Sequence, residues 1–143
     1  MTDNAQQRPE CRNINAFKDL PTYRLPAAGW VSILHRVSGA LMFLLLPFII
    51  WLFEKSLSSE ISFGEFKAAF NAGIGWYPGW FITLVTLALI WAYLHHLIAG
   101  SRHLFMDATH SVSKAFGRSS AIFTLACSIG LTVVLGAKLF GLY

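Results

Sequence analysis

Polar residues at helical spacing lie inside an apolar stretch near the start of the chain. The segment SILHRVSG places Ser32, His35, Arg36 and Gly39 at positions i, i+3, i+4 and i+7. Residues at this spacing share one face of a helix. A guanidinium at the centre of a membrane helix costs on the order of 3 kcal/mol, and less where it reaches the interface. Such a face is by default a candidate functional site that needs a polar partner.

A second set of polar residues shares one face of a later helix. The segment HHLIAGSRHLFMD begins at residue 95 and carries His96, Gly100, His103 and Asp107 at i, i+4, i+7 and i+11. Consecutive membrane helices run in opposite directions, so the start of the first helix and the end of the second lie at similar depth. We therefore expect both polar faces to meet in the cytoplasmic half of the bilayer.

His96 has the chemistry of a haem-iron ligand. It lies six residues, roughly 9 Å along a helix, deeper than Arg102, and a neutral imidazole can ligate haem iron. Gly100, one turn along, has no side chain and would let a flat macrocycle approach. His95 points about 100° away from His96 in a helix, so at most one of the two serves the same pocket.

Three further side chains lie nearer the cytoplasmic surface, where they could pair with the anionic propionates of haem b: His35, Arg36 and His103. Alternatives stay open at this point. Taken alone, Arg36 is also consistent with a side chain whose guanidinium reaches the membrane interface. His35 is also consistent with a histidine that is hydrogen-bonded to a neighbouring helix. A structural polar cluster without a cofactor is the main alternative to a haem site.

The composition predicts the elements that position these residues. Of the 143 residues, 55% are hydrophobic and only 13% are charged, which is unusual for a soluble domain. Three stretches have no Asp, Glu, Lys or Arg, and each can supply roughly 20 residues of membrane helix: 37–53, 68–101 and 119–137. We expect an all-α membrane protein with spans at about 30–53, 78–104 and 119–141, where Pro47 could bend the first.

The distribution of basic residues predicts the orientation. Eight Lys and Arg residues lie in the N-terminal tail, at the start of the first span or in the second loop, against three elsewhere, namely Lys55, Lys67 and Lys138. The positive-inside rule then places the N-terminus and the second loop in the cytoplasm. We expect a cytoplasmic tail over 1–26 and a membrane anchor over 27–143. The tail resembles neither a signal nor a transit peptide, which favours a bacterial inner membrane.

Other features of the sequence carry less information. The basic residues flank apolar runs and form no stripe with aromatic residues, so nucleic acid is not an expected partner. Cys11 and Cys127 have no metal-type spacing and lie in different environments, so a disulfide is not expected. Residues 57–70 alternate in a helix-like way and predict a short surface helix in the first loop.

The two quoted segments together resemble the cytochrome b556 membrane-anchor subunits of succinate dehydrogenase, respiratory complex II. The resemblance extends over all three spans, from Arg8 and Pro9 to the C-terminus, although the polar tail before Pro26 is longer than expected. It implies three transmembrane helices that form half of a heterodimeric helical bundle. The other half would be a second, smaller anchor subunit.

The resemblance also implies a function for each matched residue. Ser32 and Arg36 correspond to residues of the site where ubiquinone is reduced, and His96 corresponds to an axial ligand of haem b. His35, Arg36 and His103 correspond to neighbours of the haem propionates. The smaller anchor would supply the other axial histidine, so this chain would hold haem b only together with its partner.

The rest of the complex would carry the remaining redox groups. FAD and the iron–sulfur clusters are expected only in a flavoprotein subunit and an iron–sulfur subunit on the cytoplasmic face. The enzyme would couple the tricarboxylic acid cycle to electron transport, and this chain alone would not be catalytic. The alternatives are the anchor of a related fumarate reductase and a cofactor-free structural anchor or small transporter subunit, because the sequence fixes neither the direction of the reaction nor the quinone.

Overall fold

A computed structural model describes residues 13–15, 17–19 and 22–143. The described residues form five α-helices and no strand. The helices are α1 (Ala27–Leu44), α2 (Leu46–Leu57), α3 (Glu60–Asn71), α4 (Gly79–Thr109) and α5 (Lys114–Leu139). Three of them, α1, α4 and α5, are long and apolar enough to cross a membrane. The expected all-α membrane fold is confirmed.

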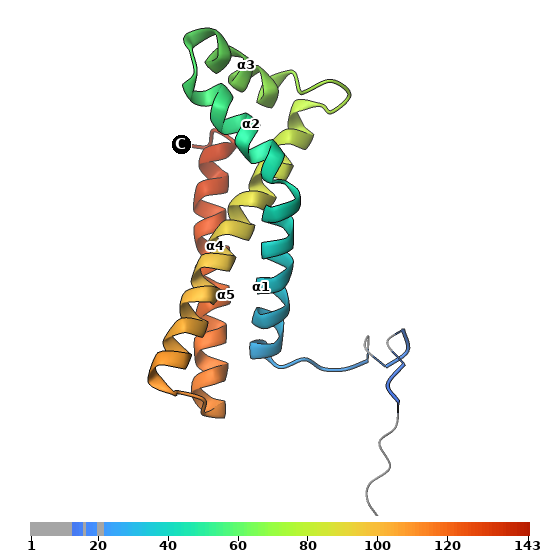
Figure 1. Ribbon diagram of the computed structural model, residues 1–143, viewed down its shortest axis with the longest axis vertical. Coiled ribbons are helices and arrows are strands. Elements are labelled where there is room, and N and C mark those ends of the chain that lie inside the picture. The colour runs from blue at the N-terminus through green and yellow to red at the C-terminus, as the bar shows by residue number, and fades with distance from the viewer. Residues whose placement is uncertain (1–12, 16, 20–21) are drawn as a thin grey trace, which may run out of the picture.

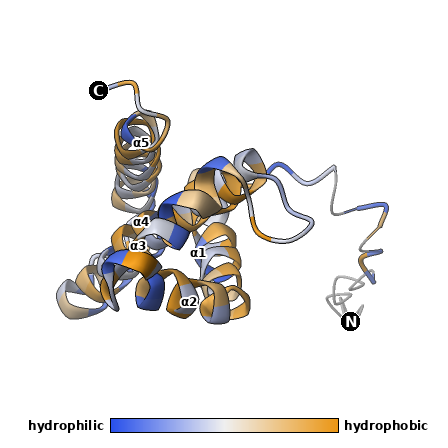
Figure 2. Ribbon diagram, turned by 90° about the horizontal axis from the view of Figure 1, so that it is seen from above, coloured by the Kyte–Doolittle hydropathy of each residue, from blue (hydrophilic) through white to orange (hydrophobic). Residues whose placement is uncertain are grey.

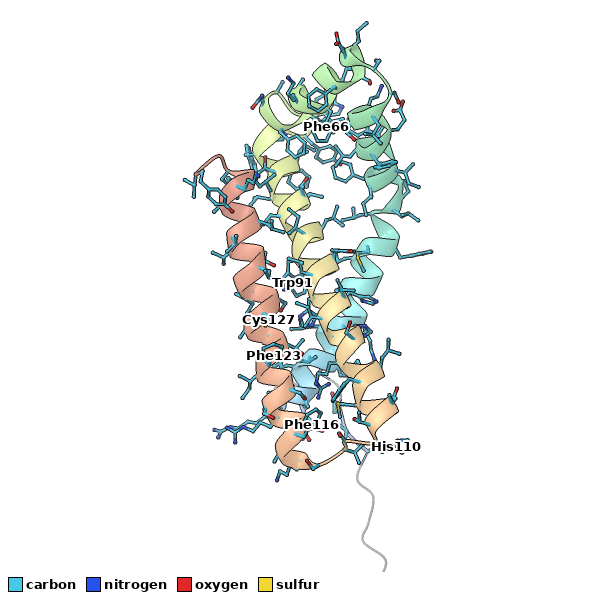
Figure 3. The ribbon with its side chains drawn as sticks, turned by 90° about the vertical axis from the view of Figure 1, so that its left-hand side faces the viewer. Phe66, Trp91, His110, Phe116, Phe123 and Cys127 are labelled. Atoms are coloured by element: carbon cyan, nitrogen blue, oxygen red, sulfur yellow. The ribbon has the colours of Figure 1, made fainter. Side chains whose placement is uncertain are left out.

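The three long helices run side by side, and α2 and α3 lie together at one end of the bundle (Figure 1). Seen along the bundle, α4 lies between α5 on one side and α1 on the other (Figure 2). The turn between α4 and α5, which contains His110, lies at the end opposite α3 and its Phe66 (Figure 3). This arrangement makes α4 the central element, with α1 and α5 each packed against it.

The first apolar stretch, expected as one helix over 30–53, is divided into α1 and α2. Leu45, with φ of −93° and ψ of 7°, separates the two helices, and Pro47 lies in the first turn of α2. Proline has no backbone N–H, and its ring clashes with the carbonyl four residues earlier. In the first turn of a helix neither defect matters, so the first apolar stretch divides and α2 begins at Leu46, with Pro47 in its first turn.

The short helix expected in the first loop is confirmed as α3. Ser59 caps it: its hydroxyl accepts from the Ser62 backbone N–H at 3.1 Å, and the Ser62 hydroxyl accepts from the Ser59 backbone N–H at 2.8 Å. Reciprocal bonds of this kind satisfy two backbone donors that a helix start leaves free. An ion pair of 2.7 Å between Lys55 and Glu65 joins α2 to α3, and its hydrogen bond raises the pKa of Lys55 above the ordinary value.

Glycine closes the junction between α3 and α4. Gly73 has a φ of 97°, in the left-handed region that favours glycine. Gly79 begins α4, close to the expected start of the second span at 78, and packs against the end of α3. A Cβ at Gly79 would overlap the Phe70 carbonyl oxygen and would lie 2.7 Å from that of Asn71. The approach of α4 to α3 therefore depends on a residue without a side chain.

The core of the three-helix bundle is built from small and polar residues. The fully buried or nearly fully buried positions where the three helices meet include Val31 and Ser38 on α1, Ala92, His95 and Ala99 on α4, and Ala121, Thr124 and Ser128 on α5. On both α4 and α5 the buried positions are separated by three and then four residues, which is one stripe of a helix. Small residues in such stripes let membrane helices approach closely.

Most of the apolar surface of the long helices is not covered by this chain. In the apolar 18-residue segment of α1, only 11% of the residues are buried within the bundle. The corresponding shares are 28% for α4 and 22% for α5. Large side chains such as Phe43, Phe123 and Val133 are more than half exposed. An exposed apolar surface of this extent requires lipid or another protein to cover it.

Candidate functional site

His96 of α4 is fixed by two groups of α1. Its Nδ1 lies 3.0 Å from the backbone carbonyl oxygen of His35 and 3.2 Å from the hydroxyl of Ser38. The Ser38 hydroxyl itself donates to the same His35 carbonyl at 2.8 Å. The two helices that carry the polar faces are therefore joined at the histidine that the sequence singled out.

These contacts assign the tautomer of His96. A backbone carbonyl only accepts hydrogen bonds, so the bond to His35 requires a proton on Nδ1 of His96. The Ser38 hydroxyl has donated its hydrogen to His35 and can accept from the same Nδ1–H. In the neutral imidazole the proton on Nδ1 leaves a lone pair on Nε2. Histidines that ligate metals are commonly held in this way, through the ring nitrogen that does not bind the metal.

The His35 imidazole lies face to face with that of His96. The ring centroids are 4.0 Å apart and the planes are inclined by 15°. His103, two turns further along α4, lies with its ring centroid 5.4 Å from that of His35. The structure thus brings together three histidines that the sequence placed on facing surfaces, His35, His96 and His103.

Two glycines leave the space that these imidazoles fill. A Cβ at Gly39 would lie 3.0 Å from Cε1 of His96, and a Cβ at Gly100 would lie 3.4 Å from Nε2 of His35. Gly100, which the sequence suggested as an approach for a macrocycle, therefore faces the His35 ring. Because Gly39 has no side chain, His96 of α4 can approach the backbone of α1. Gly100 likewise lets His35 of α1 approach the backbone of α4.

Ser32 and Arg36 have polar groups that are not engaged within the bundle. Ser32 is half-buried, and its hydroxyl donates to no other group in the described part of the chain. By contrast, the hydroxyls of Ser38, Thr83 and Thr124 donate to carbonyls of their own helices. Arg36 is exposed and, among the described residues, forms no ion pair. Both side chains are free to bind a group from outside the chain.

His95, unlike its neighbour His96, has a hydrogen-bond partner on α5, and it also lies close to the Val31 backbone of α1. His95 is completely buried, with Nδ1 3.2 Å from the hydroxyl of Ser128 on α5. Its ring also stacks on Trp91, with centroids 5.5 Å apart. Trp91 lies about midway along α4 (Figure 3). Because His95 is enclosed by its own chain, a large planar cofactor has no access to it.

Three contributors to this region were not singled out from the sequence. Ser38 lies within the first motif, three residues after His35, and that spacing is the signal that could have found it. Arg102 donates from Nε to the Ser120 hydroxyl at 2.9 Å and from a terminal nitrogen to the Gly117 carbonyl at 3.1 Å. It therefore ties α4 to α5. Ser128 of α5 is completely buried beside His95.

Other sequence expectations have a simpler outcome. Over residues 13–15, 17–19 and 22–143, no three His, Cys, Asp or Glu side chains are placed to bind one metal ion. Cys127 is a free thiol, whereas Cys11, Arg8, Pro9 and most of the predicted cytoplasmic tail lie outside the described residues.

Comparison with protein families identifies similar chains. The sequence model of the family described as succinate dehydrogenase/fumarate reductase transmembrane subunit matches residues 6–135. That match covers both polar faces, all of α1 and α4, and α5 up to residue 135.

Individual relatives are similar over most of their length. A succinate dehydrogenase cytochrome b556 subunit from Coxiella burnetii is 33% identical over 118 residues, which are 82% of this chain and 90% of that protein. The subunit of the same name from Paracoccus denitrificans is 30% identical over 80% of this chain and 83% of that protein. A succinate dehydrogenase cytochrome b560 subunit from Reclinomonas americana is 28% identical over 65% of this chain.

Proposed function

The chain belongs to the succinate dehydrogenase/fumarate reductase transmembrane subunit family, and from this we propose that it is the larger membrane anchor of a succinate:ubiquinone oxidoreductase. In this function it would bind haem b jointly with a second anchor and would form part of the ubiquinone site. The observation that carries the proposal is the hydrogen bonding of His96. Its Nδ1–H is held by α1 while the Nε2 lone pair remains.

The residues present fit a haem group. His96 would ligate the iron through Nε2, with its ring orientation set by the His35 carbonyl and the Ser38 hydroxyl. His35, Arg36 and His103 would offer hydrogen-bond donors and positive charge to the two propionates. When bound, the haem supplies a one-electron redox centre between the anchors. The protein supplies binding, orientation and a low-dielectric setting.

The quinone would be held by the remaining residues of the α1 face. Ser32 would donate its hydroxyl hydrogen to a quinone carbonyl. Arg36, one turn further along α1, would stabilise the negative charge that develops on the quinone oxygens as electrons arrive. Reduction takes two electrons and two protons, and neither residue forms a covalent bond to the substrate. Their free polar groups in the bundle support this assignment.

The complex would contain three partners. A second, smaller anchor would cover the exposed apolar face of α1 and supply the other axial histidine, which agrees with the small buried fraction of α1. The iron–sulfur and flavoprotein subunits would bind at the cytoplasmic face and carry the iron–sulfur clusters and FAD. The chain would lie in a bacterial inner membrane with its N-terminus in the cytoplasm.

A fumarate-reducing complex is the closest alternative, because the matched family includes anchors of both enzymes. The two differ in the direction of electron flow and in the potential of the quinone. Steady-state rates of the purified complex with succinate and with fumarate would separate them.

The test of the proposal is the haem spectrum of the purified complex. The wild-type complex should give the pyridine haemochrome spectrum of haem b, and His96→Leu should lose it because iron loses an axial ligand. His110→Ala is the matched control, since His110 is an exposed histidine in the turn after α4. Retention of a normal haem b spectrum in His96→Leu would refute the assignment of His96, and a wild-type complex without haem would refute the proposed function.

A further inference from the structure

His95 is the largest side chain of the bundle that is completely buried, and the proposed function gives it no role. It occupies the middle position of the buried stripe of α4, between Ala92 and Ala99. The facing stripe of α5 holds Thr124 and Ser128. An imidazole in a seam of otherwise small side chains sets the distance and the rotation at which the two helices pack.

The contact with Ser128 joins α4 to α5. The Ser128 hydroxyl lies 3.2 Å from the Leu125 carbonyl oxygen of its own helix and 3.2 Å from Nδ1 of His95. Nε2 of His95 is buried, lies toward the Val31 backbone of α1, and forms no hydrogen bond of good geometry in the described part of the chain. The contact with Ser128 is therefore the best-defined hydrogen bond of this imidazole, and stacking on Trp91 holds its plane.

The neighbouring imidazole is fixed in the same manner on the other side of α4. His96 follows His95 by one residue, about 100° around the helix, and its Nδ1–H is bound by α1. The two adjacent histidines thus attach α4 to α5 and to α1 at the same level. A helix that is hydrogen-bonded to different helices on two of its sides is not free to rotate about its own axis.

We propose that the hydrogen bond between His95 and Ser128 is a positioning contact that fixes the rotation of α4 and thereby the direction in which His96 presents Nε2. The proposal rests on the proposed function, because it gives His95 a role toward the iron ligand beside it. His95 touches neither the haem nor the quinone. Without the contact, α4 and the His96 ring adopt a different orientation while the ligand itself is retained.

Ser128→Ala in the intact complex tests this with little change in volume. Haem content, measured as the pyridine haemochrome, and succinate oxidation with a soluble acceptor should both equal those of wild type. The electron paramagnetic resonance g-values of the oxidised haem, which respond to the orientation of the axial imidazoles, should shift. The midpoint potential should shift with them.

Two comparisons separate positioning from general packing. Thr132→Val is the matched control, since Thr132 lies one turn along α5 and donates only to the Ser128 carbonyl, at 2.7 Å; its g-values should equal those of wild type. His95→Leu should shift the g-values, whereas His95→Asn, whose amide can replace Nδ1 as the hydrogen-bond partner of Ser128, should lie closer to wild type.

Each outcome has a definite meaning. Wild-type g-values in Ser128→Ala, or equal shifts in Ser128→Ala and Thr132→Val, would overturn the positioning role and leave the proposed function intact. Loss of haem in His95→Asn together with retention in His96→Asn would make His95 the ligand and overturn both. A wild-type complex without haem b would remove the proposed function, and this inference with it.

Discussion

Ser32 and Arg36 stand one helical turn apart on α1, with side chains that the chain itself does not use. Residues four apart on a helix have Cβ atoms about 6 Å apart, so a hydroxyl and a guanidinium at these positions can act on one small polar molecule. The hydroxyl offers a single directed hydrogen bond. The guanidinium offers charge that does not depend on pH in the physiological range.

We predict that substitutions here reduce quinone turnover selectively. Ser32→Ala removes one neutral hydrogen bond, worth about 0.5–1.5 kcal/mol, and should lower kcat/KM for ubiquinone about two- to tenfold. Arg36→Leu removes a charged donor, worth about 1.5–3 kcal/mol, and should lower it about ten- to a hundredfold. Rates with succinate and a soluble acceptor provide the control.

Unchanged rates with the soluble acceptor would show that the complex has assembled and that only the quinone step is affected. A parallel fall in both activities would instead mean a defect of assembly, and it would contradict a quinone-binding role. The haem spectrum should persist in Ser32→Ala, because Ser32 is not among the proposed haem contacts.

At the scale of helices, the position of α4 is fixed at both ends and in the middle. Gly79 packs the start of α4 against the end of α3. His95 and His96 fix it near the middle, and Arg102 joins its last third to α5 through Ser120 and Gly117. Helix pairs in membranes gain little from hydrophobic burial, so close packing and hydrogen bonds of this kind determine the arrangement.

We predict that Gly79→Ala disrupts the junction between α3 and α4. The added Cβ would overlap backbone carbonyls of Phe70 and Asn71, which have no flexible end to move aside. The strain should cost about 1–3 kcal/mol, as other overpacked substitutions do. Hydrogen–deuterium exchange of peptides over 58–82 in the complex should then be faster than in wild type.

Gly64→Ala is the matched control for this experiment. Gly64 lies within α3, and a Cβ there would meet no atom within 4 Å. The substitution should slow exchange in α3, because alanine is favoured over glycine in a helix by about 0.5–1 kcal/mol. Equal exchange in Gly79→Ala and wild type would contradict the close approach of the two helices.

At the scale of the whole molecule, the two ends of the bundle differ in charge and structure. One end carries the turn between α4 and α5, flanked by Arg102, Lys114 and Arg118. The other carries α2, α3 and the turn at residues 72–78 (Figure 1). From the positive-inside rule we expect the first of these ends to lie in the cytoplasm.

Cysteine labelling should report this orientation. In a chain with both native cysteines replaced by serine, Ser111→Cys should react with a membrane-impermeant maleimide only in inverted inner-membrane vesicles. Trp76→Cys, in the turn before α4, should react only in right-side-out vesicles. Both positions lie between helices, and the Trp76 side chain is 99% exposed. The reverse labelling pattern would overturn the proposed topology.

The sequence determined the elements and their faces. Apolar stretches long enough to cross a bilayer predicted three long helices, and α1, α4 and α5 confirm them. The spacing within SILHRVSG and HHLIAGSRHLFMD predicted which residues share a face, since the direction of a side chain around a helix follows from 3.6 residues per turn. The same rule separated His95 from His96 before any contact was known. Composition alone did not predict that the first apolar stretch divides into two helices at Leu45. The place of that division depends on the backbone conformation around Pro47.

Only the tertiary structure decided which group each face meets. Helical periodicity gives directions within one helix, but it gives neither the axial offset between two helices nor the angle at which they cross. Those quantities place the His35 carbonyl beside His96 and the Ser128 hydroxyl beside His95. Hydrogen bonds act over about 3 Å, so a shift of one residue along either helix would exchange the partners. For that reason the tautomer of His96 and the enclosure of His95 follow from the packing of α1, α4 and α5.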